Sequence, residues 1–231
     1  MKNYIVATIK PWNIAAFHRH AETLPGGWHL VSAKDELTPA LIRKIAPQYI
    51  FFPHWSWIVP QEILDAAECV CFHMTDVPYG RGGSPLQNLI IRGHKDTKLT
   101  ALRMVPELDA GPVYLKKPLS LEGRAQDIFE RAADLVYDMM RVIVDSGPVP
   151  MPQQGTVVKF ERRTPQMSAL PDTEDTTMLY NHIRMLDAQT YPAAFIDHSA
   201  FRLIFRYADL QENGTLKAQV EIIPRGKVDI L

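Results

Sequence analysis

Short apolar runs alternate with helix-like segments over the first 150 residues of this 231-residue chain. The runs rich in β-branched and aromatic residues predict strands, and the segments between them open with prolines that suit a first helical turn. Alternation of this kind favours the α/β class, with a mostly parallel sheet covered by helices. The predicted strands are 3–9, 28–32, 49–52 and 68–73, and the predicted helices are 11–22, 38–45 and 60–67.

The strongest helical pattern spans 125–143, where apolar residues recur at steps of three and four. The pattern stops at Gly147 and Pro148, two residues that commonly end a helix. Before it, 99–105 and 113–119 predict two further strands that are separated by a turn.

Proline, glutamine and glycine dominate 149–155, and this composition predicts a domain boundary. The segment that follows contains several short β candidates and one helix candidate. We therefore expect a catalytic domain at 1–150 and a small, β-rich C-terminal lobe at 151–231. The β candidates of the lobe are 157–160, 193–196, 201–207 and 218–223, and its helix candidate is 176–186.

The formal net charge of −1 narrows the range of partners. A chain this close to neutral has no overall field that would attract nucleic acid or an anionic membrane, so we expect neither partner. The apolar run at the start is too short and too soon interrupted for a signal peptide. Two cysteines, Cys69 and Cys71, provide no disulfide framework and fit a reducing compartment. The sequence thus predicts a cytoplasmic protein.

The candidate chemistry lies between His73 and Asp109, which are separated by glycine- and proline-rich turns. Such turns hold polar side chains in fixed positions on surface loops, where catalytic groups concentrate, so this stretch favours an enzyme. Cys69, Cys71 and His73 share one face of a predicted strand, but that spacing is unusual for zinc, and we predict no metal site. No G-x-G-x-x-G follows the first strand, so a dinucleotide site is unsupported.

An ordered set of residues from His73 to Gly111 resembles the formyltransferase domain of folate-dependent enzymes. The resemblance implies a Rossmann-like sheet, N10-formyltetrahydrofolate as the formyl donor, an amine as the acceptor, and no metal. The matching residues are His73, Thr75, Pro78, Arg81, Gly82, Pro85, Gly93, Thr97, Thr100, Leu108, Asp109 and Gly111.

Within this resemblance, His73 and Asp109 are the expected catalytic pair. The imidazole would stabilise the oxygen that gains negative charge and pass on the proton of the amine, and the carboxylate would hold the imidazole. The residues expected to bind the donor are Trp55, Pro78, Arg81, Gly82 and Leu108, and those expected to bind the acceptor are Thr75, Arg184 and Tyr191.

Two positions depart from the family pattern. Cys71 occupies the place where members usually carry an asparagine, and Lys98 stands where a glycine commonly follows the threonine. A thiol is a weaker hydrogen-bond donor than an amide, so the Cys71 position lacks a strong donor for the developing oxyanion. His54, in the aromatic segment 52–57, is the expected substitute donor.

The C-terminal segments 180–187 and 191–195 resemble the small lobe of sugar N-formyltransferases. This resemblance implies a nucleotide-linked amino sugar as acceptor, and specifically a UDP-4-amino-4,6-dideoxy sugar of the type found in pseudaminic acid pathways. Three alternatives stay open. The acceptor could be Met-tRNA or another small amine, or the chain could be a catalytically impaired protein that binds folate or a nucleotide sugar. A homodimer is compatible with the sequence.

Overall fold

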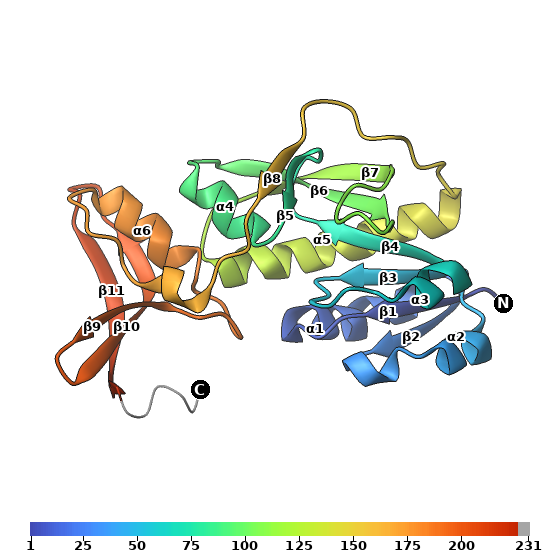
Figure 1. The fold of residues 1–231 in the computed structure, drawn as a ribbon, viewed down its shortest axis with the longest axis horizontal. Coiled ribbons are helices and arrows are strands. Elements are labelled where there is room, and N and C mark those ends of the chain that lie inside the picture. Colours follow the sequence, from blue (N-terminus) through green and yellow to red (C-terminus); the bar gives the residue numbers. More distant parts are fainter. Residues whose placement is uncertain (226–231) are drawn as a thin grey trace.

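A six-stranded sheet in the order β2-β1-β3-β4-β6-β7 forms the centre of the computed structural model, which describes residues 1–225 (Figure 1). The first four strands in this order run parallel, and β6 pairs antiparallel with both β4 and β7. The predicted α/β class with a mostly parallel sheet is confirmed. The strands are β1 (Asn3–Ala7), β2 (Gly27–Val31), β3 (Tyr49–Pro53), β4 (Glu68–His73), β6 (Asp96–Arg103) and β7 (Val113–Ser120).

Helices cover both faces of this sheet. Successive strand residues point to opposite faces, so Val6 packs into the cluster that contains α1 and α5, whereas Ile5 packs into the cluster that contains α2 and α3. The long helix ends at Gly147, which adopts a left-handed conformation with φ 54°, as its sequence pattern predicts. The helices are α1 (Pro11–His20), α2 (Pro39–Ile45), α3 (Gln61–Ala66), α4 (Pro85–Ile91) and α5 (Ala125–Ser146).

The C-terminal part begins with a segment that crosses the sheet domain. Its strand β8 (Val158–Phe160) pairs in parallel with β5 (Tyr79–Gly82), a four-residue strand that the sequence patterns do not predict. The chain then forms α6 (Thr176–Arg184) and an antiparallel sheet in the order β11-β10-β9 (Figure 1). The strands of this sheet are β9 (Ala194–His198), β10 (Phe201–Leu210) and β11 (Leu216–Pro224).

The two parts share one hydrophobic core. Ile183, Leu186 and Ala194 are buried in the same cluster as α1 and α5. Gln87 of α4 also donates a hydrogen bond to the carbonyl of Met185 at 3.1 Å. Apolar contacts and a hydrogen bond therefore join the two parts. The domain boundary near residue 150 stays a prediction. Within residues 1–225, no helix is both long and apolar enough to span a membrane.

Candidate active site

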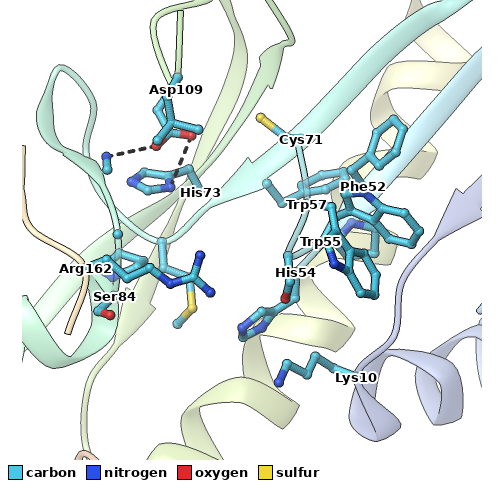
Figure 2. Close-up of a pocket in the computed structure, with 18 of the residues that line it drawn as sticks. Lys10, Phe52, His54, Trp55, Trp57, Cys71, His73, Ser84, Asp109 and Arg162 are labelled. Atoms are coloured by element: carbon cyan, nitrogen blue, oxygen red, sulfur yellow. Dashed lines mark hydrogen bonds and ion pairs between the residues drawn. The ribbon is translucent and has the colours of Figure 1, made fainter. Parts of the chain in front are cut away.

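A cavity of about 1020 Å³ opens where β1, β3 and β4 end at their carboxyl edge. Parallel sheets commonly bind ligands at this edge, because the loops that follow the strands converge there. His54 follows β3, and His73 ends β4. Both line the cavity together with Cys71 and Asp109 (Figure 2). The register that pairs Phe52 with Cys71 brings the two histidine-bearing strand ends side by side.

His73 is buried and has a partner at each ring nitrogen. Nε2 lies 2.7 Å from the carbonyl oxygen of Gly80, and Nδ1 lies 3.6 Å from Oδ1 of Asp109. A carbonyl only accepts hydrogen bonds, so Nε2 must carry a hydrogen. Nδ1 is therefore the ring atom that can gain or release a proton. The 3.6 Å between this nitrogen and Asp109 is too long for a hydrogen bond, but it places a carboxylate oxygen beside the ring.

Asp109 lies in the turn between β6 and β7, where its backbone conformation and a hydrogen bond from Gly82 of β5 hold it in place. The residue has a φ of 54°, a left-handed conformation that aspartate tolerates better than most residues. Its Oδ2 accepts a hydrogen bond from the backbone N–H of Gly82 at 2.9 Å (Figure 2). Gly82 pairs with Phe160 of β8, and an added Cβ at Gly82 would lie 2.3 Å from the Phe160 carbonyl oxygen. Only glycine fits this position.

Gln153 holds the turn that carries Asp109, and the sequence patterns do not reveal it. Its amide nitrogen donates to the carbonyls of Asp109 and Gly111, each at 2.8 Å. Its oxygen accepts from Nε and Nη2 of Arg81 at 3.0 and 2.9 Å. Arg81 also approaches Glu107 at 3.7 Å. The Arg81 guanidinium thus holds the turn and is not among the groups that line the cavity.

Cys71 lies on the same strand face as His73 and lines the cavity. Burial, together with the charge of Asp109, raises the pKa of its thiol well above the ordinary range. The thiol therefore stays protonated and offers only a weak hydrogen bond. Lys98, the other departure, lies 2.9 Å from Asp76 in a surface ion pair.

An aromatic segment forms one wall of the cavity. The rings of Trp55 and Trp57 meet edge to face with centroids 5.0 Å apart, and both residues line the cavity (Figure 2). Val105 and Leu108 contribute further apolar surface to the lining. Apolar walls with a few polar groups are typical of sites for flat organic ligands.

His54 forms a hydrogen bond with Tyr191 in the C-terminal part of the chain. It has a φ of 58°, and its Nε2 lies 2.8 Å from the hydroxyl of Tyr191. Burial and the charge of Lys10 lower the pKa of His54 to about 3, so the ring is neutral at physiological pH. Burial also raises the pKa of Tyr191, so its hydroxyl keeps its proton. Nδ1 of His54 makes no hydrogen bond within residues 1–225 and remains the ring nitrogen available to a ligand.

Three other expected site residues lie outside the cavity lining. Thr75 is fully buried and donates to the Gly80 carbonyl at 3.3 Å. The Pro78 carbonyl accepts from the N–H of Val158, which anchors β8. Arg184 donates to the carbonyls of Leu121 and Gly123 at 2.7 and 2.9 Å. In this structure all three support the fold around the site. Gly82, Trp55, Leu108 and Tyr191 do line the cavity.

Several polar groups that line the cavity carry no recognisable signal in the sequence. Lys10 follows β1, Asn13 lies on α1, and Arg162 follows β8. They belong to segments without a recognisable motif, so only their convergence in space reveals them. Among residues 1–225, no three His, Cys, Asp or Glu side chains are grouped so that they could hold a metal ion.

Several known proteins that are similar to this chain belong to one family. The sequence model described as "Methionyl-tRNA formyltransferase, C-terminal domain" matches residues 165–223. A solved structure of a methionyl-tRNA formyltransferase from Clostridium thermocellum is 43% identical, with a TM-score of 0.93 over 97% of this chain and 100% of that one. A methionyl-tRNA formyltransferase from Lysinibacillus sphaericus is 29% identical over 67% of this chain and 51% of its own length. The chain thus spans about half the length of that curated relative.

A sugar N-formyltransferase from a Shewanella species has the same fold but little sequence in common. Its structure has a TM-score of 0.63 and is 15% identical over 95% of this chain and 96% of that one. Identity at this level shows the fold alone. The expectation of a nucleotide-linked amino sugar as acceptor, with its pseudaminic acid pathway, is therefore wrong, since the 43% identity is to a methionyl-tRNA formyltransferase.

The expectation that nucleic acid is excluded is not supported either. It rested on the formal net charge of −1, which sums over the whole chain. A sum of this kind does not describe how charges are distributed over the surface or within a cavity.

Proposed function

This chain belongs to the formyltransferase family, and on that basis we propose that it transfers a formyl group from N10-formyltetrahydrofolate to the amine of methionyl-tRNA. The donor follows from the family. The choice of acceptor is supported by the names of the relatives that match over most or all of this chain. The two free cysteines are consistent with a cytoplasmic location, which is part of the same proposal.

The observation that carries the proposal is the buried pair of His73 and Asp109 at the wall of the cavity. When the amine attacks the formyl carbon, it must lose a proton, and the formyl oxygen gains negative charge. Nδ1 of His73 would take up that proton, because Nε2 is already occupied by the Gly80 carbonyl. Asp109, 3.6 Å away, would stabilise the charged imidazole.

The protonated His73 then has two uses. Its Nδ1–H would donate a hydrogen bond toward the formyl oxygen and afterwards return the proton to the departing nitrogen of the donor. Cys71 would add little to this stabilisation because its thiol is a weak donor. His54 is the proposed second donor, through the Nδ1 that its bond to Tyr191 leaves available.

The aromatic side of the cavity fits the donor. N10-formyltetrahydrofolate carries its formyl group between a pteridine and an aminobenzoyl ring, and Trp55 and Leu108 would lie against the apolar faces of these rings. Gly82 lines the same cavity, and its backbone would lie near the donor. A volume of about 1020 Å³ is at the upper end for one small ligand, which leaves room for the end of an acceptor beside the donor.

Formylation of methionyl-tRNA tests the proposal directly. The protein is incubated with N10-formyltetrahydrofolate and methionyl-tRNA, and the methionyl adenosine released by nuclease is weighed by mass spectrometry. A gain of one formyl group is expected, and none is expected with a UDP-linked amino sugar. If the protein binds the donor but transfers no formyl group to methionyl-tRNA, the proposed function is wrong.

The Asp109→Asn variant tests the proposed mechanism. Asparagine tolerates the same backbone conformation and can still accept the Gly82 hydrogen bond, so the main loss is the negative charge beside His73. We expect kcat to fall by about 10²-fold or more with little change in the KM for the donor. Glu107→Gln, in the same turn but largely exposed, is the matched control and should keep kcat. Equal activity of the two variants would contradict the assigned role of Asp109.

A further inference from the structure

The charges that line the cavity are unbalanced, although the chain as a whole is close to neutral. Among the described lining residues, Asp109 is the one carboxylate. The cationic lining residues are Lys10, Arg103, Arg162 and Arg163. Arg103 is neutralised by Glu68 at 2.7 Å, whereas the other three make no ion pair with an acidic residue within 1–225. An excess of positive charge in a cavity attracts an anionic ligand.

Lys10 is held in place without being neutralised. Its ammonium donates to Oγ1 of Thr190 at 2.8 Å and lies 4.9 Å above the ring of Tyr191. The ring of Trp12 is 5.6 Å from the same nitrogen. These contacts use one of the three N–H donors of the ammonium for a hydrogen bond and leave two for a ligand.

Arg162 reaches the cavity because β8 is anchored to the loop after β5. The N–H of Gly83 donates to the Phe160 carbonyl, and Gly83 packs so closely on Arg162 that an added Cβ would lie 2.5 Å from the Arg162 Cβ. The Arg162 guanidinium forms no hydrogen bond or ion pair with another residue of the range 1–225. Figure 2 shows it extending into the cavity toward the side where His54 and Lys10 lie.

We propose that Lys10 and Arg162 form an anion subsite that binds a phosphate group of the formyl acceptor. The inference rests on the proposed function and specifies how the acceptor is held. Burial lowers the pKa of Lys10, and the charge of Arg162 lowers it further, so the two cations repel each other. A phosphate between them would relieve this repulsion. Guanidinium and ammonium groups are both common phosphate ligands.

The position of the subsite favours the acceptor over the donor. Thr190 and Tyr191, which hold Lys10 and His54, lie within residues 165–223, which match the C-terminal domain model. The apolar wall assigned to the donor is formed by Trp55 and Leu108, from other segments. In methionyl-tRNA the nearest phosphate to the amine belongs to the terminal nucleotide. The carboxylates of the donor's glutamate are the competing anion, and the experiment separates the two.

The test compares two minimal acceptors, 2′(3′)-O-methionyl-adenosine and its 5′-monophosphate, in the wild type and in Arg162→Gln and Lys10→Met. We expect the wild type to prefer the phosphate-bearing acceptor in kcat/KM. Each substitution should reduce that preference on the order of 10- to 100-fold and leave kcat/KM for the uncharged acceptor nearly unchanged. Arg43→Gln, an exposed arginine outside the cavity lining, removes the same charge and should have no effect.

A second series assigns the anion. Donor kinetics are measured with N10-formyltetrahydrofolate and with the analogue that lacks the glutamate. If Arg162→Gln and Lys10→Met weaken only the donor that carries glutamate, the subsite belongs to the donor and the proposal is overturned. An equal loss on both acceptors would also overturn it.

A binding measurement keeps the proposal testable if no formyl transfer is found. Adenosine 5′-monophosphate and adenosine are titrated into the wild type and Arg162→Gln by calorimetry. Tighter binding of the monophosphate that is lost in the variant supports the subsite even if the proposed function fails. If the wild type binds adenosine 5′-monophosphate and adenosine with equal affinity, the proposed anion subsite is wrong.

Discussion

Arg81 donates to Gln153, and Gln153 in turn holds the backbone of Asp109, so in this structure a residue expected to bind a ligand supports the turn of the proposed catalytic aspartate. The sequence reveals that Arg81 is a strong hydrogen-bond donor but not which acceptor lies within its reach. At the residue scale, His73, Asp109 and Cys71 do meet in one cavity, as their spacing predicts. The supporting contacts to Gly80 and Gly82 depend on the shape of the loop between them.

Cys71→Asn should increase the rate of formyl transfer. The amide would donate a stronger hydrogen bond to the formyl oxygen than the protonated thiol does. In other enzymes, removing one such donor lowers kcat by about 10²- to 10³-fold. We expect a smaller gain of about 10-fold or more in the single-turnover rate, because the larger asparagine side chain must also fit beside its neighbours. Cys71→Ser serves as a small polar control. An unchanged rate would contradict the expected gain and would mean that the side chain at position 71 does not limit formyl transfer.

His54 should make the protein less stable as the pH falls. Its pKa is lowered to about 3 by burial in the folded state, whereas an exposed histidine titrates near 6.5, so the unfolded state binds more protons between these values. The free energy of unfolding should therefore drop as the pH falls through this window. In His54→Asn the drop between pH 7.5 and pH 5 should be smaller by about 2 kcal/mol in urea denaturation. The exposed His18→Asn should keep the wild-type drop.

At the scale of elements, short strands and turns decide how the site is assembled. Helix α5 and strands β1, β3 and β4 follow from hydrophobic periodicity, which is a local property of the sequence. Strand β5 has four residues with two glycines, and it exists as a strand because β8 pairs with it. Such pairing between segments far apart in the chain cannot be deduced from either segment alone. The same pair presents Gly82 to Asp109.

Gly111→Ala should disrupt the turn that carries Asp109. An added Cβ at Gly111 would lie 1.7 Å from the Arg103 carbonyl oxygen, so the turn must move. We expect a loss of about 2 kcal/mol or more in unfolding free energy, together with a fall in kcat. Gly93→Ala is the control, because Gly93 has a φ of +78° but no atom within 4 Å of an added Cβ. That substitution should cost only about 1–2 kcal/mol and leave kcat unchanged.

At the scale of the whole molecule, the C-terminal part completes both the core and the cavity. Leu186 and Ile183 are buried against the same cluster as α5, and Tyr191 and Arg162 reach the cavity from beyond residue 150. The boundary predicted near residue 150 was inferred from composition, which marks a change in local structure. Composition does not reveal whether the two parts can fold independently.

Leu186→Ala should destabilise the entire chain in one transition. Removing a fully buried leucine costs about 2–5 kcal/mol, and the shared core should transmit that loss to the sheet domain. All four tryptophans lie before residue 60, so their fluorescence follows mainly the N-terminal part, and Trp12 also stacks on Tyr191 with ring centroids 6.4 Å apart. The midpoint of the tryptophan-monitored urea transition should fall. It should stay almost unchanged in Ile222→Ala, whose side chain is 62% exposed. If Leu186→Ala leaves the midpoint of this transition unchanged, the two parts unfold as independent domains.

The sequence by itself determined the α/β class, most helices and strands, the formyltransferase family and the catalytic candidates His73, Cys71 and Asp109. These rest on periodicity and on residues in fixed order, and both can be read along the chain. The tertiary structure alone decided that Lys10, His54, Arg162 and Tyr191 share a cavity with them, and that Arg81 faces Gln153. The physical reason is that cavity walls and ion pairs depend on contacts between segments far apart in sequence, which local patterns do not encode.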